Sequence, residues 1–327
     1  MKTLPRLPTL IAAAGLALFA AQAGAQGAPS TWPSQPVKLV VPFTAGSTSD
    51  LAARAVARGI EKPLGQPVVV ENRPGANGAI GMQAVARAKP DGHTFVVGSI
   101  SSTAVPAVIL KAPPFELFKE FEPVAVIAGT TLLLVAAADS PIDSLPALLA
   151  AAKQRPGALN YANSAGLFQL AMESLKLQAG VDLAPIAYKG PSDATSDLLG
   201  GRLSVQPDSL GSATGLIQGG KTKALVVLSG ERTPRLPNVP TMQELGYKDF
   251  DFNGWIGVLA PAGTPAPILE KMHAEIAKAM ASEELRQVYA TAAIDPVVMS
   301  PTRYRELLER ETSKYRRIAE QAGIEKK

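Results

Sequence analysis

VKLVVPFTAGSTSD, residues 37–50, is the stretch that decides the fold class of this chain. Its first half, residues 37–43, is an apolar run typical of a buried strand. A loop of small and polar residues follows, and the helical pattern of residues 51–60 comes directly after it, with Ser49 or Asp50 as the expected N-cap. A strand, a short loop and a helix in succession indicate an α/β fold.

The same alternation continues through the rest of the chain. Further strands are predicted at residues 67–72, 94–99, 159–162, 184–188, 203–205 and 224–228. Helices are predicted at residues 80–89, 169–179, 194–199 and 212–218, and one more ends near residue 154 after an N-cap at Ser144. Because the strands are apolar runs with few alternating polar positions, we expect parallel sheets covered on both faces.

Two places in the sequence predict passages between two lobes. Residues 123–128 and 132–137 are predicted as two strands in close succession, and residues 255–260 as the returning strand. We therefore expect a two-lobed α/β fold whose hinge consists of two crossing strands. Lobe 1 would hold residues 26–129 with 253–327, including helices at 267–280, 283–291 and 301–321, and lobe 2 would hold residues 130–252. Loops at the carboxyl ends of strands from both lobes would then face one cleft, where open α/β sheets bind ligands.

The N-terminus has the pattern of a secretory signal peptide, which we assign to residues 1–25. Lys2 and Arg6 give a positive start, an apolar run covers residues 10–21, and Ala23-Gly24-Ala25 fits a cleavage site. An uncleaved anchor helix is the alternative, but the apolar run is short for a bilayer span. The pattern predicts a secreted, periplasmic protein.

Composition argues against several classes of function. The chain has no cysteine, only two histidines and 5% aromatic residues, and its net charge of +4 comes from intermixed charges of both signs. Nucleophile motifs, nucleotide-binding glycine motifs and metal-ligand spacings are missing from the sequence. We therefore expect no enzyme activity, no catalytic residue, no cofactor, no metal and no nucleic-acid partner.

The loop after the first strand is the first candidate binding site. Small residues at a helix N-terminus expose backbone N–H groups and the positive end of the helix dipole, which together suit a carboxylate. The candidate ligand-binding residues here are Phe43, Thr44, Ala45, Gly46, Ser47, Thr48 and Asp50. Asp50 would repel a carboxylate in direct contact, so we expect it to cap the helix or to bind a ligand amine or a bridging water. An ordinary βα turn is the alternative for the whole loop.

Other strand ends carry further candidates. In lobe 1, the hydroxyls of Ser101, Ser102 and Thr103 suit a carboxylate, with helix capping or turn bonds as the alternative. For the loop at residues 73–78, a structural turn near the cleft is favoured over direct contact. The lobe 2 candidates are Asn163, Ser164, Ala165, Gly166, Tyr188, Lys189, Gly190 and Asp208. Lys189 could instead be a solvated surface charge, and Asp208 could anchor the hinge.

These segments, in this order, resemble one known family. They are WP at 32–33, VPFTAGSTSD at 41–50, VENRPGANG at 70–78, KPDGHT at 89–94, AYKG at 187–190, DLLGG at 197–201, PNVPT at 237–241 and GVLAPAGTP at 257–265. The chain looks like the Bug family, the extracytoplasmic solute-binding receptors of tripartite tricarboxylate transporters. The resemblance implies a type II periplasmic-binding-protein fold, a membrane transporter as partner, and a ligand carboxylate held by amides and hydroxyls of the first loop, partly through water. The hydroxyl loop at residues 101–103 and the lobe 2 loops would complete the pocket.

Two departures from the family pattern concern the ligand. Gly46-Ser47 stands where the family usually has a Gly-Gly pair, so Ser47 would add a hydroxyl donor or narrow the carboxylate-binding site. The segment YANSAGLFQ, residues 161–169, is shorter than usual, with Gln169 in place of a histidine and with Leu167 and Phe168 making this side more apolar. A monocarboxylate with an apolar or aromatic body is therefore an alternative to the usual di- or tricarboxylate.

The sequence thus predicts a periplasmic solute-binding receptor that captures a small carboxylate between its lobes and delivers it to membrane transporter subunits. We expect it to act as a monomer, because such a receptor must present both lobes to its partner. A periplasmic sensor that presents the bound carboxylate to a signalling partner is the alternative, since the two roles differ on the outer surface and not in the pocket.

Overall fold

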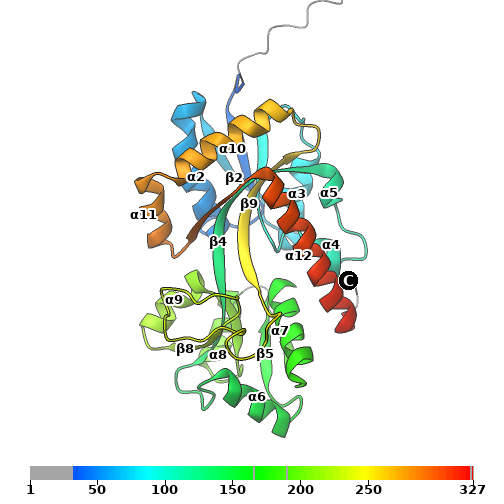
Figure 1. Ribbon diagram of the computed structural model, residues 1–327, viewed down its shortest axis with the longest axis vertical. Coiled ribbons are helices and arrows are strands. Elements are labelled where there is room, and N and C mark those ends of the chain that lie inside the picture. Colours follow the sequence, from blue (N-terminus) through cyan, green and yellow to red (C-terminus); the bar gives the residue numbers. More distant parts are fainter. Residues whose placement is uncertain (1–31, 165, 189–190, 325, 327) are drawn as a thin grey trace, which may run out of the picture.

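Figure 1 shows two lobes stacked along the long axis of a computed structural model and joined by the strands β4 (Phe121–Ala137) and β9 (Asn253–Pro261). The structure describes residues 32–164, 166–188, 191–324 and 326, so the expected signal peptide lies outside the described residues. Among these residues, no helix combines the length and the apolar character that a bilayer-spanning segment needs.

The upper lobe in Figure 1 is built around a sheet flanked by helices. Its elements are β1 (Val37–Val41), α2 (Thr48–Leu64), β2 (Val68–Asn72), η1 (Ala76–Gly78), α3 (Ala79–Ala86), β3 (Thr94–Ser99), α4 (Pro106–Ile109), α5 (Leu117–Glu120), α10 (Ala266–Met280), α11 (Glu283–Thr291) and β10 (Asp295–Met299). Helix α12 (Pro301–Gln321) starts in this lobe and runs down past the hinge.

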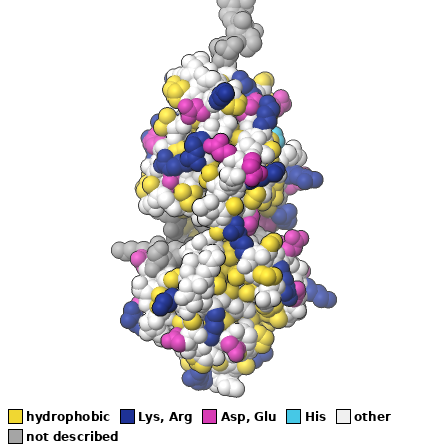
Figure 2. Space-filling view, turned by 90° about the vertical axis from the view of Figure 1, so that its left-hand side faces the viewer, with side chains coloured by type: hydrophobic (Ala, Val, Ile, Leu, Met, Phe, Trp, Pro, Cys, Tyr) yellow, Lys and Arg dark blue, Asp and Glu magenta, His cyan; other side chains and the backbone are white. Residues whose placement is uncertain are grey.

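The lower lobe contains the elements that lie between the two crossing strands in the sequence. They are α6 (Leu145–Gln154), β5 (Asn160–Asn163), α7 (Gly166–Ala179), β6 (Ala184–Ala187), α8 (Pro191–Leu199), β7 (Gln206–Ser209), α9 (Leu210–Gln218) and β8 (Thr222–Val227). Ser144 caps α6 as predicted, because its hydroxyl accepts a hydrogen bond from the amide of Ala147. On the face seen in Figure 2, basic and acidic side chains are interspersed over both lobes, and a waist separates them.

The main sheet has the strand order β10-β4-β9-β3-β1-β2, with β7 and β8 paired to the lower part of β4. The expectation of parallel strands is correct for β1 with β2 and β3, and for β5 with β6. It is wrong for every described pair that involves β4 or β9, all of which are antiparallel. The reason is topological, since the chain leaves the upper lobe along β4 and returns along β9 in the opposite direction.

Strand β4 is continuous, whereas the sequence predicted two separate strands at 123–128 and 132–137. The link between them keeps its pairing, because Thr130 and Thr131 lie opposite Gly254 and Asn253 of β9. The Thr130 side chain occupies the space beside Gly254, since a Cβ on Gly254 would lie 1.9 Å from the Thr130 hydroxyl oxygen. A side chain at residue 254 would therefore displace the Thr130 hydroxyl from its place in the hinge.

Two apolar clusters support the upper lobe and the hinge. One cluster lies between the sheet and helices α2, α10 and α11, and includes Leu39, Ile60 and Tyr289. The other continues from the upper lobe into the lower lobe through Val105, Leu167 and further buried residues. Helix α12 contributes to this second cluster, so the lobes are packed together by side chains as well as joined by strands.

Two local predictions were wrong. The N-cap of α2 is Ser47, whose hydroxyl accepts the amide of Asp50, and not Ser49 or Asp50. The strand predicted at residues 203–205 is displaced to β7, where Ser209 pairs with Leu132 of β4. Strand β7 was not recognised in the sequence because its residues, QPDS, are mostly polar, whereas a buried strand is normally recognised by a run of apolar residues. Strand β10 and the short helices α4 and α5 were not predicted.

Replacing Gly257 of β9 by alanine should lower the free energy of unfolding by about 1–3 kcal/mol, the usual cost of overpacking a core. A Cβ at this position would lie 2.4 Å from the ring carbon Cζ of Tyr304, which is fully buried. Urea denaturation measures the change. The matched control is Gly215→Ala on α9, where nothing lies within 4 Å of the added Cβ and helix propensity improves. Equal stability for the two variants would contradict the packing account.

Candidate functional site

A cavity of about 800 Å³ lies between the lobes. Its volume is within the range of about 300–1,000 Å³ that is typical of small-molecule sites. The upper wall comes from the loops that follow β1, β2 and β3, and the lower wall from the start of α7 and from Ser209. Both crossing strands reach it, through Thr130 and Leu132 of β4 and Gly254 to Ile256 of β9. The predicted interlobe cleft is therefore present, with the hinge strands at its back.

The loop after β1 supplies the clearest hydrogen-bond donors of the upper wall. Phe43, Thr44, Ser47, Thr48 and Ser49 all line the cavity. Within the described chain, the backbone N–H groups of Thr48 and Ser49 have no acceptor, because they belong to the first turn of α2. Their donors and the positive end of a 17-residue helix are therefore available to an anion in the cavity.

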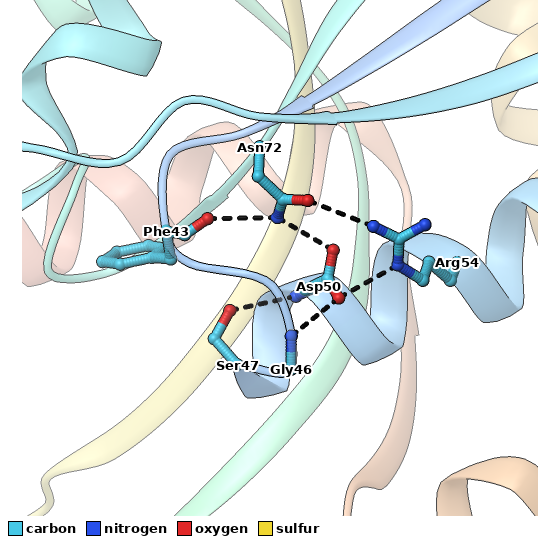
Figure 3. A network of polar contacts seen from close by, with 6 residues as sticks. All are labelled: Phe43, Gly46, Ser47, Asp50, Arg54 and Asn72. Carbon is cyan, nitrogen blue, oxygen red and sulfur yellow. Dashed lines mark hydrogen bonds and ion pairs between the residues drawn. The ribbon is translucent and has the colours of Figure 1, made fainter.

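Asp50 fixes the loop after β1 through a network of polar contacts (Figure 3). One carboxylate oxygen accepts the Gly46 amide at 2.9 Å and Arg54 Nε at 3.0 Å, and the other accepts Asn72 Nδ2 at 2.8 Å. The same Asn72 nitrogen donates to the carbonyl of Phe43 at 3.1 Å, so the end of β2 is tied to the end of β1. Asp50 itself is 2% exposed and does not line the cavity.

The charge of Asp50 is stabilised by these contacts. Burial alone would raise the pKa of the Asp50 carboxyl, but hydrogen bonds from Arg54, the Gly46 amide and Asn72, together with the Arg54 charge, outweigh it and lower the pKa below its usual value. The carboxylate is thus ionised and its acceptors are directed to the protein. Ala45 and Gly46 also lie off the cavity wall, with Gly46 in the left-handed conformation at φ 81°.

The hydroxyl residues after β3 fall into two groups, one that lines the cavity and one that bonds back to the backbone. Ser101 lines the cavity, and so does Ser99 before it. Ser102 and Thr103 are buried and donate to the carbonyl of Ser99, at 3.0 and 2.8 Å. The alternative of turn bonds therefore describes Ser102 and Thr103, and only Ser101 of the three predicted residues faces the cavity.

The loop after β2 reaches the cavity, although the sequence favoured a structural turn beside it. Pro74, Gly75, Ala76, Gly78 and Ala79 all line the wall. Gly75 and Gly78 have φ values of 128° and 91°, which confirms that glycine serves the turn. Both descriptions therefore hold for this loop, since its backbone forms the turn and also part of the wall.

In the lower lobe, only part of the predicted set lies on the cavity. Ser164 and Gly166 line it, together with Leu167 and Phe168. The lobes approach each other closely at Gly166, because a Cβ there would lie 2.5 Å from Cγ1 of Val105. Ala165, Lys189 and Gly190 lie outside the described residues.

Asn163, Tyr188 and Asp208 do not line the cavity. The Asn163 carbonyl accepts the Tyr188 amide at 3.0 Å, and the Tyr188 hydroxyl donates to Asp197 at 2.7 Å. Asp208, at 2% exposed, accepts the Ser209 amide at 2.8 Å beside the junction of β7 and β4. This placement corresponds to the alternative given for Asp208, an anchor next to the hinge.

Much of the wall was missed by sequence reasoning. The missed lining residues are mostly apolar, namely Ile100, Val105, Pro106, Ile109, Leu110, Pro114, Leu132, Trp255 and Ile256. In the described part of the wall the polar side chains are hydroxyls and the indole of Trp255, whose buried Nε1 has no hydrogen-bond partner among the described residues, and none is acidic, basic or a histidine. Among the described lining residues, the groups that suit a carboxylate are therefore neutral donors and the N-terminal ends of helices.

Two lobes, an interlobe cavity and a two-strand hinge define the class of two-lobed solute-binding receptors. The family described as tripartite tricarboxylate transporter family receptor matches residues 52–324. Protein BugT of Bordetella pertussis is 33% identical over 97% of this chain and 98% of its own. The chain therefore belongs to the tripartite tricarboxylate transporter receptors of the Bug type, a family of solute-binding receptors.

Solved structures have the same fold. An R. palustris protein with adipate is similar with a TM-score of 0.80 and 31% identity, covering 89% of this chain and 98% of that one. MatC from Rhodopseudomonas palustris with bound malate is similar with a TM-score of 0.76 and 30% identity, covering 88% and 99%.

Asp50→Asn should loosen the loop after β1, because an amide cannot accept all the hydrogen bonds that the carboxylate accepts. We expect a loss of about 1–3 kcal/mol in the free energy of unfolding, as for a buried hydrogen-bond partner left unpaired. Hydrogen exchange of the amides at residues 44–49 should accelerate. The control is Asp139→Asn, at an exposed carboxylate in the loop after β4. Unchanged exchange at residues 44–49 would show that Asp50 does not fix the loop.

Asp208 should make stability depend on pH between about 4 and 6. Burial raises its pKa to about 6, against hydrogen bonds from the Ser209 amide, Ser212 and Gln206 that lower it. The unfolded value is about 3.9, so in this interval the native state binds more protons and the free energy of unfolding falls as pH rises. The full effect is about 2–3 kcal/mol.

The variant Asp208→Asn lacks this titration. Its free energy of unfolding relative to the unaltered protein should therefore rise between pH 4 and pH 7, as measured by urea denaturation at intervals of one pH unit. A constant difference across this range would mean that Asp208 titrates normally.

Proposed function

We propose that this protein is a periplasmic receptor that binds a small carboxylate in the interlobe cavity and delivers it to the membrane subunits of a tripartite transporter. The observation that carries the proposal is the pair of acceptor-free amides of Thr48 and Ser49 at the N-terminus of α2, facing the cavity. Asp50 supports them by fixing the loop, with bonds to Gly46 and Asn72. Donors held in place before binding cost little ordering entropy when the anion arrives.

Related proteins support a carboxylate as the ligand. The R. palustris structure holds adipate and the MatC structure holds malate, and both share the fold and about a third of their residues with this chain. Direct contacts would come from Phe43, Thr44, Ser47, Thr48 and Ser101 in the upper lobe, and from Ser164 and Gly166 in the lower lobe. Asp50 and Gly46 act behind the loop, and Ala165, Lys189 and Gly190 remain candidates near the start of α7 and α8.

Delivery follows from a change of shape at the hinge. We place the lobe boundaries at residues 129/130 and 252/253, where β4 and β9 pass between the lobes. A ligand that contacts both lobes binds the closed form better than the open form and shifts the population toward closure. The transporter would recognise the closed form of a monomer. Cleavage of a signal peptide after residue 25 would release this receptor into the periplasm.

The proposal is tested by removing one donor without disturbing the helix. Proline is tolerated at the first position of a helix, and Ser47 already has the extended conformation that precedes proline (φ −65°, ψ 158°). Thr48→Pro therefore deletes one free N–H, while Thr48→Val keeps it and loses only the hydroxyl. Loss of one hydrogen bond to a charged group is worth about 1.5–3 kcal/mol, which weakens carboxylate binding about 10- to 150-fold.

Binding is measured by titration calorimetry with the tightest acid from a thermal-shift panel of linear mono- and dicarboxylates. The primary amide of that acid is the ligand control, since it keeps the shape and lacks the charge. Thr48→Pro should weaken the acid much more than Thr48→Val does, and the amide should bind weakly to all forms. A folded protein that binds no acid of the panel, or equal binding by the two variants, would refute the proposed site.

A further inference from the structure

We propose that the contact between Gly166, at the start of α7, and Val105, at the start of α4, holds the two lobes together beside the cavity, and that the absence of a side chain at residue 166 sets how readily the receptor closes. This inference rests on the proposed function and concerns the closing step of the same site. It follows from the place where the lobes touch, because both residues line the cavity and they belong to different lobes.

The contact leaves no room for a side chain at residue 166. A Cβ on Gly166 would lie 2.5 Å from Cγ1 of Val105 and 3.0 Å from Cδ1 of Ile109, whereas carbon atoms in contact are about 3.5–4.0 Å apart. The backbone does not require glycine, since Gly166 is the first residue of α7 and has the helical conformation that other residues adopt. Alanine would even favour the helix. The close approach of the lobes is therefore the constraint at this position.

Val105 is held too firmly to move aside for a side chain at residue 166. It is 1% exposed, and its β-branched side chain is restricted to few rotamers. Its backbone is held too, because its amide donates to the carbonyl of Ile100 at 3.2 Å and its carbonyl accepts the amide of Ile109 at 3.1 Å. Helix α12 packs against α4 as well. A side chain at residue 166 would therefore have to be accommodated by a movement of α7.

Helix α7 is fixed within the lower lobe, so we expect it to move only with that lobe. Leu170 and Met172 of α7 are fully buried, and the Tyr161 hydroxyl donates to Glu173 at 2.8 Å, which ties β5 to α7. Figure 1 shows α4 and α7 in different lobes on the same side of the crossing strands. A steric clash between them would therefore rotate the lower lobe away from the upper lobe about β4 and β9, which opens the cavity.

The contact favours closure independently of any ligand. Val105, Ile109 and Leu167 bring apolar surface from both lobes together, and the removal of this surface from water stabilises the closed form. A ligand then binds an arrangement that is already populated, and its apparent affinity is proportional to the populated fraction. Loosening the contact would therefore lower the affinity for every ligand of the cavity by the same factor.

A double-mutant cycle tests this coupling. Gly166→Ala should weaken binding of the tightest acid of the thermal-shift panel by about 5- to 150-fold, the effect of overpacking the contact between the lobes. Val105→Ala removes the methyl groups that the new Cβ would meet, so in that background the same Gly166→Ala change should cost much less affinity. Titration calorimetry on the four proteins measures the coupling, and a second acid of the panel should be weakened by the same factor.

Three comparisons separate a role in closing from other effects of the substitution. An alanine Cβ that obstructed the ligand directly would weaken binding equally with and without the Val105 side chain. A packing defect within one lobe would lower the midpoint of urea unfolding, as expected for Gly257→Ala, whereas Gly166→Ala should leave the midpoint nearly unchanged because the lobes separate instead. Gly215→Ala, with nothing within 4 Å of the added Cβ, should change neither the affinity nor the distance between the lobes.

The distance between the lobes can be measured without a ligand. The chain has no cysteine, so Lys111→Cys and Leu177→Cys place spin labels at two chosen exposed positions, one after α4 and one on α7. Pulsed electron paramagnetic resonance should show a short distance as a resolved population in the protein without added acid. Gly166→Ala should transfer that population to longer distances, the addition of Val105→Ala should bring it back, and a saturating acid should restore it in every variant.

The outcomes separate this inference from the proposed function. If acids bind and Gly166→Ala changes neither the affinity nor the distance, the carboxylate receptor stands and the inference is wrong. If no acid binds but Gly166→Ala lengthens the distance, the proposed function fails and the closing contact is still supported. Equal losses of affinity with and without the Val105 side chain would overturn the inference, and so would the lack of a short distance in the unaltered protein without added acid.

Discussion

Antiparallel pairing of β4 with β9 is the constraint on which the rest of the molecule depends. It joins Phe121 to Pro261 at one end and Thr131 to Asn253 at the other, so one ribbon belongs to both lobes. The upper sheet extends from this ribbon through β3, and the lower lobe attaches to it through β7 and β8. Because each lobe is built on the same two strands, the cavity between them is created by the ribbon and opens directly onto it.

The site combines the hydrogen-bond donors of the loop after β1 with a largely apolar wall. A buried carboxylate, Asp50, fixes this loop: it does not line the cavity, and it accepts hydrogen bonds from Gly46 in the loop, Arg54 on α2 and Asn72 on β2. An anion can therefore bind beside this loop although the loop leads into an acidic residue, Asp50. The negative charge is compensated by Arg54 behind the loop, and the helix presents its positive end to the front. Selectivity then depends on the rest of the wall.

Sequence reasoning predicted the elements with strong local patterns. The strand, loop and helix at residues 37–60, the returning strand β9 and the cap at Ser144 all have residue types that act through immediate neighbours. Features set by distant parts of the chain were missed or displaced, such as β7, whose polar residues become a strand only by pairing with Leu132 to Val135. The residues of the candidate site likewise fall into those that have a local sequence signal and those that have none.

Loops of small polar residues after strands are visible in a sequence, and the first loop indeed lines the cavity. Ile109, Leu110 and Trp255 give no such signal, because an apolar side chain in a pocket is chemically the same as one in a core. Likewise, nothing local distinguishes Ser101, on the wall, from Ser102, which bonds back to Ser99. The direction of a side chain in a turn is decided by the tertiary fold, and therefore the sequence could not separate Ser101 from Ser102 and Thr103.

The order of the strands has a consequence for how the chain is made. Strands β1 to β3 emerge first, but β3 finds its neighbour β9 only after residue 253. The strands and helices of the lower lobe lie between these points and can form contacts that are close in sequence, which generally form faster. Until the C-terminal part arrives, β3 has a bare edge that can pair with another chain. A molecule interrupted before β9 therefore exposes an unpaired sheet edge, which makes complete synthesis a condition for avoiding aggregation.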